Sequence, residues 1–444
     1  MKQFLQKILR FLAKSILAKY KPEIIGITGS VGKSSTREAI YAVLSGELSV
    51  RQSEKNYNNE LGVPLTIIGA KSANRSPWGW FKVILKGLDL ILFFDKNYTK
   101  ILILEMAADH PGDIKYLVSI APCRIGIVTT ISGVHLEFFG TIENIIKEKQ
   151  IIVTRLDKNG YAILNADDDL VFKMKDKTKA TVITYGFSEN SDLRAMEMFL
   201  AGLEFEAEEF DENITPESHW DSREWGTNLK LSYKGSAVPV FLPRVLGKQQ
   251  VSAALAGAAV GLIYGLNLVQ ISAALKNYQS PAGRMNLISG IKHTMLIDDT
   301  YNASPISTKA ALETMKDINL PIGAKKIAVL GDMLELGSAS AAGHKEVGKS
   351  AYDAGVDLLV TVGKEALNIS EGAQDFGFDE NKIMSFNDTN EAGRFLQEEI
   401  KSGDLILIKG SQGMRMERIV KELMAEPLKA CSLLVRQDKS WECR

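Results

Sequence analysis

The segment Ile24–Thr36, IIGITGSVGKSST, constrains the fold of this chain most. β-Branched residues precede a glycine turn, and Lys33-Ser34 begin what reads as a helix. Such a strand–turn–helix unit turns backbone N–H groups and the positive end of a helix towards a phosphate chain. Gly29 and Gly32 allow close approach, the Lys33 ammonium can reach phosphate oxygens, and the Ser34 hydroxyl can ligate Mg²⁺. The segment therefore predicts a nucleotide-binding loop, with an ordinary glycine-rich turn as the alternative.

Composition and cysteine content narrow the class of protein. The chain has 444 residues, enough for two or three domains with sizeable cores. Its formal net charge is −1, so no global field favours nucleic acid, and we expect no nucleic-acid partner. Cys123, Cys431 and Cys443 lie far apart in the sequence and form no metal-ligand pattern. Since no secretory signal is evident, we expect a cytoplasmic protein.

The first 21 residues differ from the rest of the chain. They contain six basic residues and no acidic one, and their apolar residues recur at helical spacing. This pattern predicts a basic amphipathic helix over residues 1–21, either packed on the adjoining domain or lying on an anionic membrane. A second apolar stretch, Trp78–Phe94, is interrupted by Lys82, Lys86 and Asp89. It predicts another amphipathic helix rather than a membrane span.

Short apolar runs alternate with helical segments over most of the chain, which predicts an α/β fold with parallel sheets. Residues 190–245 differ, because they combine an acidic cluster, Glu204–Glu212, with alternating segments, and they predict an antiparallel β-rich part. A new α/β series begins near Pro281, so we expect domains over residues 22–280 and 281–444. The expected strands are 101–105, 125–130, 162–165, 182–185, 294–298, 326–330, 358–362 and 405–409.

Several polar residues stand where strands are expected to end. Glu105 closes the run ILILE, where its carboxylate can face Mg²⁺ or pair with a lysine. His135 follows a strand and a glycine, which favours a metal or phosphate role over a structural one. Lys149 lies in an expected helix, where a surface lysine is the default interpretation. Asn56–Asn59 reads by itself as a turn, and Asp298–Asn302 suits ribose or metal contact, or a loop cap.

Together these segments resemble the Mur ligase family, ATP-dependent amide-bond ligases of peptidoglycan precursor synthesis. The resemblance covers about residues 22–425, and within the family it is strongest to the branch that adds D-alanyl-D-alanine to a muramoyl-tripeptide. The similar segments are TGSVGKSST (28–36), NYNNELGVPLT (56–66), LEMAADHPGDI (104–114), VHLEFFGT (134–141), NADDD (165–169), DDTYNASP (298–305), LGDMLELG (330–337) and KGSQGMRME (409–417).

The resemblance implies a central P-loop-type ATPase domain with a parallel sheet, followed by a Rossmann-like α/β domain, and closure that assembles the site. ATP would phosphorylate a peptide carboxylate, and the amine of D-alanyl-D-alanine would attack the acyl phosphate of the muramoyl-peptide acceptor. The implied cofactors are ATP and two Mg²⁺ ions, with Lys149 carbamylated. The implied residues are Gly29, Ser30, Gly32, Lys33, Ser34, Ser35, Arg284, Asp299 and Asn302 for the nucleotide; Ser34, Glu105, His135 and Lys149 for metal; Lys33, His135 and Lys149 for catalysis; and Asn56, Asn58 and Asn59 for the substrate.

Three departures from the family pattern bear on these expectations. Ile151 stands where the family usually has a glutamate, two residues after the lysine that is carbamylated. The block that helps to hold adenine has Gln250 and Ala253 in place of asparagines, so we expect different adenine contacts. Only about 21 residues precede the phosphate-loop strand, so we expect the family's N-terminal uridine-nucleotide domain to be absent.

Two alternatives follow. The first is a Mur-like ligase or amidating subunit that acts on a different acceptor, such as a lipid-linked one, which the basic N-terminal helix favours. The second is a nucleotide-binding scaffold that no longer ligates. The presence of Lys33, Glu105, His135 and Lys149 argues against the scaffold, because a protein that only binds nucleotide has no need for all four.

Overall fold

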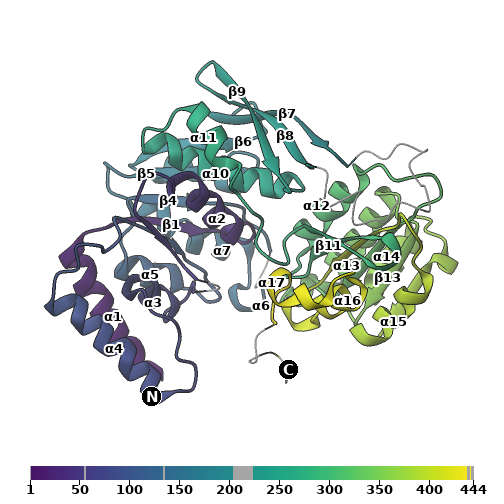
Figure 1. The fold of residues 1–444 in the computed structure, drawn as a ribbon, viewed down its shortest axis with the longest axis horizontal. Coiled ribbons are helices and arrows are strands. Elements are labelled where there is room, and N and C mark those ends of the chain that lie inside the picture. The colour runs from purple at the N-terminus through teal and green to yellow at the C-terminus, as the bar shows by residue number, and fades with distance from the viewer. Residues whose placement is uncertain (1, 55–56, 134–135, 204–223, 438–440, 442–444) are drawn as a thin grey trace. The chain divides into compact units, whose positions relative to one another are not determined.

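The structure, a computed structural model, describes residues 2–54, 57–133, 136–203, 224–437 and 441. The chain divides into two compact units (Figure 1). The first comprises residues 1–197, 229–240 and 252–278, and the second comprises residues 198–228, 241–251 and 279–444.

A nine-stranded sheet organises the first unit, in the order β2-β3-β1-β4-β5-β6-β7-β8-β9. The pairs from β2 through β7 are parallel, as buried β-branched runs separated by helices require. The strands are β1 (Glu23–Thr28), β2 (Val50–Gln52), β3 (Ile101–Glu105), β4 (Ile125–Val128), β5 (Tyr161–Asn165), β6 (Thr181–Gly186), β7 (Leu193–Ala201), β8 (Gly226–Tyr233) and β9 (Ser236–Pro243).

The β-rich part predicted over residues 190–245 contains β7, β8 and β9, but its pairing is mixed. The turn Lys234-Gly235 has positive φ at both residues, which suits a tight antiparallel hairpin between β8 and β9. The start of β7 instead pairs in parallel with β6, Tyr185 opposite Leu193, so the expectation of a wholly antiparallel part is wrong there. The acidic cluster Glu204–Glu212 lies outside the described residues.

Helices cover the first sheet and begin where the sequence supplies starting signals. Ser76 accepts a hydrogen bond from Gly79 N, and Pro77 occupies the first position of α4. The helices are α1 (Lys2–Tyr20), α2 (Lys33–Leu44), α3 (Gly62–Ile68), α4 (Pro77–Leu92), α5 (Asp113–Ile120), α6 (Leu136–Phe139), α7 (Ile142–Lys149), α8 (Ile151–Thr154), α9 (Asp169–Phe172), α10 (Lys248–Ile263) and α11 (Leu268–Leu275).

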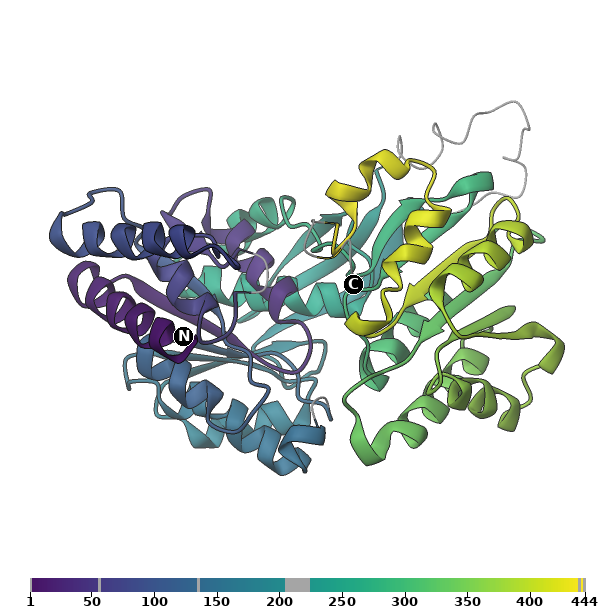
Figure 2. The same ribbon diagram turned by 90° about the horizontal axis from the view of Figure 1, so that it is seen from below.

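The predicted N-terminal helix is confirmed as α1, and one of its faces is part of the core. Leu9, Leu12, Ala13 and Ile16 are buried, and α1 packs against α3 and α4. In Figure 2, α1 and α4 lie side by side. The packed interpretation of residues 1–21 is thus correct for this face. None of the helices in the described ranges combines the length and the apolar character needed to cross a bilayer.

A six-stranded sheet organises the second unit, in the order β10-β11-β15-β12-β13-β14. β10 is antiparallel to β11, and the other pairs are parallel. The predicted strands of this unit are confirmed, and two strands that the sequence did not indicate, β10 and β14, close its edges. The strands are β10 (Asn286–Ser289), β11 (Met295–Asp299), β12 (Lys326–Gly331), β13 (Leu358–Val362), β14 (Ile383–Phe386) and β15 (Leu405–Lys409); the helices are α12 (Pro305–Lys316), α13 (Ser340–Asp353), α14 (Leu367–Asp375), α15 (Thr389–Glu399), α16 (Glu417–Leu423) and α17 (Ala430–Leu433).

Candidate active site

The predicted phosphate loop joins β1 to α2 at a switch point of the first sheet. β1 lies between β3 and β4, and ligands of open α/β sheets bind beyond the carboxyl ends of the strands at such a point. Gly29 and Gly32 have φ values of 148° and 90°, which side chains rarely tolerate. A Cβ atom on Gly29 would lie 1.9 Å from Thr129 Oγ1. Glycine at position 29 therefore lets the loop pass close to the residues after β4.

Hydrogen bonds hold this loop in place. Ser30 N donates to Thr130 O (2.6 Å), and the Ser30 hydroxyl oxygen accepts from Ser132 N (3.0 Å). Lys33 Nζ donates to the carbonyl oxygens of Gly29 (2.6 Å) and Ser30 (3.2 Å). The ammonium group therefore lies against the loop that the sequence predicts to bind phosphate. The other predicted loop residue, Ser35, is buried in the first turn of α2.

Glu105 lies beside this loop because β3 is the parallel neighbour of β1. The register sets Glu105 opposite Ile27, two residues before the loop. Ser34 Oγ donates to Glu105 Oε2 (3.2 Å), and Arg37 Nη1 lies 2.8 Å from Oε1. The buried cation beside Glu105 is thus an arginine, where the sequence suggested a lysine. Its place one turn after Ser34 on the same helix was the signal that could have revealed it.

The chemistry of these groups fits a magnesium ion. Among the described residues, Glu105 Oε1 accepts no well-aligned hydrogen bond, although the Arg37 guanidinium is close. A carboxylate beside the Ser34 hydroxyl is a donor set that Mg²⁺ prefers, with phosphate and water as further ligands. No group of three or more histidine, cysteine or acidic residues suited to a metal occurs in the part of the chain that the structure describes. His135, the third predicted ligand, lies outside the described residues.

Lys149 is the last residue of α7 and is buried against the same loop. Its side chain is 2% exposed, so the default interpretation as a surface lysine is wrong. Lys149 Nζ donates to Gly29 O (3.2 Å), the oxygen that also accepts from Lys33. Burial, together with the positive charge of Lys33, lowers the pKa of Lys149 from its usual 10.5 to about 7. A substantial fraction of this amine is therefore neutral near pH 7.

A neighbouring carboxylate that the sequence did not indicate fixes the end of α7. Glu148 is buried, and its two oxygens accept hydrogen bonds from Gly112 N (2.8 Å) and Ile114 N (2.7 Å). These N–H groups open α5, where the helix dipole favours negative charge. Because both oxygens are occupied, Glu148 acts as an anchor that sets the position of Lys149.

The segment Asn56–Asn59, predicted to contact the substrate, forms hydrogen bonds within the protein at its described residues. Asn59 Oδ1 accepts from Leu61 N (3.2 Å) and Gly62 N (3.0 Å), so this side chain caps the start of α3. Asn58 O accepts from Ala107 N (2.9 Å), which ties the segment to the residues after β3. Asn56 lies outside the described residues. The Asn59 amide therefore already has a structural use beside any contact with substrate.

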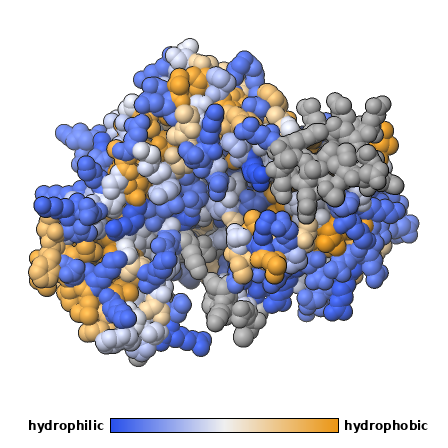
Figure 3. All heavy atoms as spheres, in the orientation of Figure 1, coloured by the Kyte–Doolittle hydropathy of each residue, from blue (hydrophilic) through white to orange (hydrophobic). Residues whose placement is uncertain are grey.

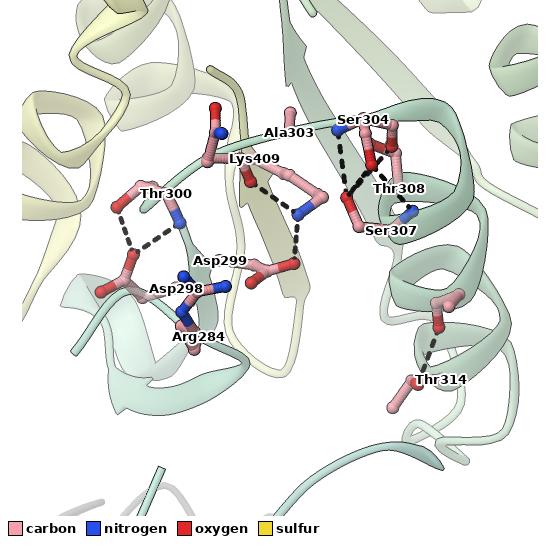
Figure 4. A network of polar contacts seen from close by, with 12 residues as sticks. Arg284, Asp298, Asp299, Thr300, Ala303, Ser304, Ser307, Thr308, Thr314 and Lys409 are labelled. Atoms are coloured by element: carbon pink, nitrogen blue, oxygen red, sulfur yellow. Dashed lines mark hydrogen bonds and ion pairs between the residues drawn. The ribbon is translucent and has the colours of Figure 1, made fainter. Parts of the chain in front are cut away.

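In the second unit, predicted residues gather at the carboxyl ends of β11 and β15 (Figure 4). Asp299 and Lys409 are register partners, and Lys409 Nζ lies 2.6 Å from Asp299 Oδ2. The same ammonium donates to Asn302 O (3.1 Å), and both partners of the ion pair are buried. Lys409 was not among the predicted site residues. Its place at the end of the apolar run LILIK, which parallels Glu105 in ILILE, was the available signal.

Asp298 and Arg284 complete this group. Asp298 Oδ1 accepts from Thr300 Oγ1 (2.6 Å), while Oδ2 has no partner among the described residues. Burial raises the pKa of Asp298 to about 6. The Arg284 guanidinium carbon lies 4.2 Å from the centre of the Tyr301 ring, and Arg284 O accepts from Gln250 Nε2 (3.1 Å). The second unit thus brings Asp299 and Asn302 together around a buried lysine, and it places Arg284 against the Tyr301 ring.

Comparison with known proteins agrees with this arrangement. Residues 85–261 match the family described as Mur ligase middle domain, and residues 283–412 match that described as Mur ligase, glutamate ligase domain. The UDP-N-acetylmuramoyl-tripeptide–D-alanyl-D-alanine ligase of Bacillus subtilis is 30% identical over 420 residues, which cover 95% of this chain and 80% of that protein. The Escherichia coli protein of the same name is 29% identical over 93% of this chain and 79% of its own length.

Solved structures show the same likeness. The crystal structure of MurF from Acinetobacter baumannii has a TM-score of 0.73 and 26% identity, and covers 94% of this chain and 79% of that one. MurF from Thermotoga maritima, solved in complex with ADP, has a TM-score of 0.72 and 26% identity, over 94% of this chain and 83% of that one. By its sequence and by the fold of both units, this chain belongs to the Mur ligase family.

Proposed function

We propose that this protein is an ATP-dependent ligase that joins D-alanyl-D-alanine to a muramoyl-peptide acceptor in peptidoglycan synthesis. The convergence of Lys33, Lys149 and the Ser34–Glu105 pair on one glycine loop is the observation that carries the proposal. The names of the relatives supply the acceptor and the amine. The ADP complex of a structural relative supports ATP as the phosphoryl donor.

In phosphoryl transfer to a carboxylate, the protein contributes mainly by positioning the reactants and by supplying positive charge, and little by covalent catalysis. The loop N–H groups, the N-terminus of α2 and the Lys33 ammonium supply that charge where the triphosphate binds. When the γ-phosphoryl group moves to the acceptor carboxylate, the acyl phosphate forms and ADP leaves. The amine of D-alanyl-D-alanine then attacks the acyl carbon, and phosphate leaves from the tetrahedral intermediate.

Two Mg²⁺ ions and a carbamate complete the proposed site. Ser34, Glu105 and His135 are the proposed ligands of one ion, and carbamylated Lys149 would support the other. Bound Mg²⁺ would neutralise the phosphate oxygens that approach one another during transfer. The lowered pKa of Lys149 supports carbamylation, since only a neutral amine adds CO₂. Glu148 would hold the modified side chain in place through its two bonds to the start of α5.

The second unit would bind the rest of the nucleotide and its phosphates. Asp299 and Asn302 are the proposed nucleotide contacts, and Arg284 is proposed to reach a phosphate. The ion pair with Lys409 supports this role for Asp299, because it fixes the carboxylate at the carboxyl end of the sheet, where ligands bind. The domains proposed from the sequence are 22–280 and 281–444. The second compact unit also takes in residues 198–228 and 241–251, which lie within the first of these ranges. We place the reaction in the cytoplasm, where ATP is available.

The experiment is a phosphate-release assay on the purified full chain with ATP, Mg²⁺ and UDP-N-acetylmuramoyl-tripeptide. We expect release to depend on D-alanyl-D-alanine and to be at least about a hundredfold slower with L-alanine, D-glutamate or L-glutamate. Equal rates with single amino acids would contradict the amine assignment. Turnover only with a lipid-linked acceptor would contradict the UDP-linked one.

A further inference from the structure

An apolar stripe runs along the outer face of α4. Trp78, Phe81, Leu85, Leu88 and Leu92 recur at intervals of three and four residues, which places them on one side of the helix. All five are exposed, from 39% for Leu88 to 72% for Leu92. Isolated exposed leucines need no explanation, but a continuous stripe that includes tryptophan and phenylalanine marks a surface that binds something.

The opposite face of α4 is fixed, so the stripe cannot turn inward. Val83, Gly87 and Leu90 are buried on that face. A Cβ atom on Gly87 would lie 2.9 Å from Leu12 Cδ1, so α4 and α1 are in close contact there. Lys19 Nζ also donates to the carbonyl oxygens of Leu90 (3.0 Å) and Ile91 (2.8 Å) at the end of α4.

The neighbouring helix extends this apolar surface. Phe4 and Phe11 of α1 are seven residues apart and are 69% and 65% exposed. In Figure 3, hydrophobic side chains gather over the region where Figure 1 places α1 and α4. The two helices therefore present a joint apolar surface, which we call the α1–α4 face: Phe4, Phe11, Trp78, Phe81, Leu85, Leu88 and Leu92.

The charges around this face have one predominant sign. Residues 3–21 and 71–96 contain ten basic and two acidic residues, whereas the remaining chain contains 43 basic and 52 acidic ones. Lys7, Lys14 and Lys82 are exposed, and Lys82 Nζ lies 6.0 Å from the centre of the Trp78 ring. Lysine stems can lie along apolar surface while their ammonium groups reach a polar layer. An apolar stripe bordered by lysines complements an anionic lipid surface.

We propose that the α1–α4 face binds anionic membranes, with α4 lying in the plane of the bilayer at the boundary between headgroups and acyl chains. The 16 residues of α4 and its lysines suit this orientation, since a span needs about 20 apolar residues. Each lysine near an anionic surface strengthens the attraction to it, and salt weakens that contribution. The stripe on α4 thereby extends the membrane contact expected of residues 1–21 to a second helix.

The test is flotation of the full chain with vesicles of phosphatidylcholine, with and without phosphatidylglycerol, at low and high salt. The stripe variant carries Phe81→Ser, Leu85→Ser and Leu88→Ser, and its control carries Phe199→Ser, Ile322→Ser and Leu428→Ser, which are exposed elsewhere. The charge variant carries Lys7→Gln, Lys14→Gln and Lys82→Gln, and its control carries Lys173→Gln, Lys175→Gln and Lys177→Gln.

We expect the unmodified chain to bind only the anionic vesicles and to dissociate at high salt. Both test variants should lower the partition coefficient at least about tenfold, and both controls should leave it unchanged. The charge variant keeps the test valid if the stripe variant loses stability. Absence of binding at low salt, or equal losses in variants and controls, would overturn the proposal. A further contradicting result would be that the chain does not bind vesicles but forms a dimer in sedimentation, and that the stripe variant abolishes this dimer. The α1–α4 face would then bind a second copy of the chain.

Discussion

At the scale of single residues, two lysines share one acceptor, the carbonyl oxygen of Gly29, and differ in what surrounds them. Lys33 is the first residue of α2, directly after the loop, where its ammonium can contact phosphate oxygens. Lys149 is buried, and both its burial and the nearby charge of Lys33 disfavour its protonated form. The same oxygen therefore accepts from a lysine suited to binding anions and from one suited to reacting as a neutral amine.

The first prediction concerns Lys33. Removing its ammonium by Lys33→Ala should lower phosphate release by at least about a hundredfold, because positioned charge supplies most of the rate in phosphoryl transfer. Lys177→Ala, an exposed lysine of the same unit, is the matched control and should keep full activity. Unchanged release in Lys33→Ala would remove the assignment of the phosphate loop.

Carbamylation of Lys149 is the second prediction. Intact-protein and peptide mass spectra, recorded with bicarbonate and without acid treatment, should show the mass of one added CO₂ on the peptide that contains Lys149. Lys149→Ala should lose activity and regain part of it with a short carboxylate such as acetate, which supplies the missing anion. Full activity of Lys149→Ala in bicarbonate-free buffer would refute the modification.

The third prediction uses the pH dependence of stability. The pKa of Lys149 is about 7 in the folded protein and 10.5 in the unfolded chain, so the unfolded chain binds more protons between these values. The stability that this lysine contributes therefore rises with pH across that window and is lost as pH falls through 7. In CO₂-free buffer, Lys149→Met should raise the melting temperature most below pH 7, with the gain shrinking towards pH 10. A gain independent of pH would contradict the buried neutral amine.

At the scale of helices and strands, α1 uses its two faces differently. Leu12 is buried against Gly87, whereas its neighbour Phe11 is 65% exposed. The fourth prediction is that Leu12→Ala lowers the free energy of unfolding by about 3 kcal/mol, through lost burial and the cavity left behind. Phe11→Ala, the adjacent control, should change it by less than about 0.5 kcal/mol. Equal effects in urea unfolding would mean that α1 is not packed as described.

The sequence predicted the elements whose local residue pattern strongly favours one type of secondary structure. Apolar runs such as ILILE and LILIK strongly favour buried strands. Their last residues, Glu105 and Lys409, therefore lie at the carboxyl ends of these strands. Edge strands of four residues, Ile383–Phe386 among them, carry too little periodicity to be recognised. The parallel start of β7 depends on its pairing with the preceding strand, β6, which the alternating pattern of residues 190–245 does not indicate.

The interaction partners of the site residues were harder to predict than the positions of those residues in the sequence. The sequence indicated Asp299 and Glu105, but their pairing with Lys409 and Arg37 follows from strand register and helix packing. The structural use of Asn59 as a cap and the burial of Lys149 are likewise tertiary facts, because each depends on the element that lies opposite. Motifs thus locate functional groups, and the fold determines their charge and partners.

At the scale of the whole molecule, the likeness to known ligases extends over both compact units. The matched domains span residues 85–261 and 283–412, and the relatives align with more than nine-tenths of the chain. The phosphate loop belongs to one unit and the Asp299–Lys409 pair to the other. The proposed site residues thus belong to both units, so the full chain is the form to use in testing the proposed reaction.

The most direct test follows oxygen atoms from substrate to product. The acceptor peptide is labelled with the heavy isotope of oxygen in its terminal carboxylate and incubated with ATP, Mg²⁺, D-alanyl-D-alanine and the full chain. An acyl phosphate requires that one labelled oxygen leave with the released phosphate, while the product gains the dipeptide and loses one water. Mass spectrometry should find label in the phosphate in a one-to-one ratio with ligated product. Unlabelled phosphate, or phosphate formed equally well without the dipeptide, would contradict the proposed ligase reaction.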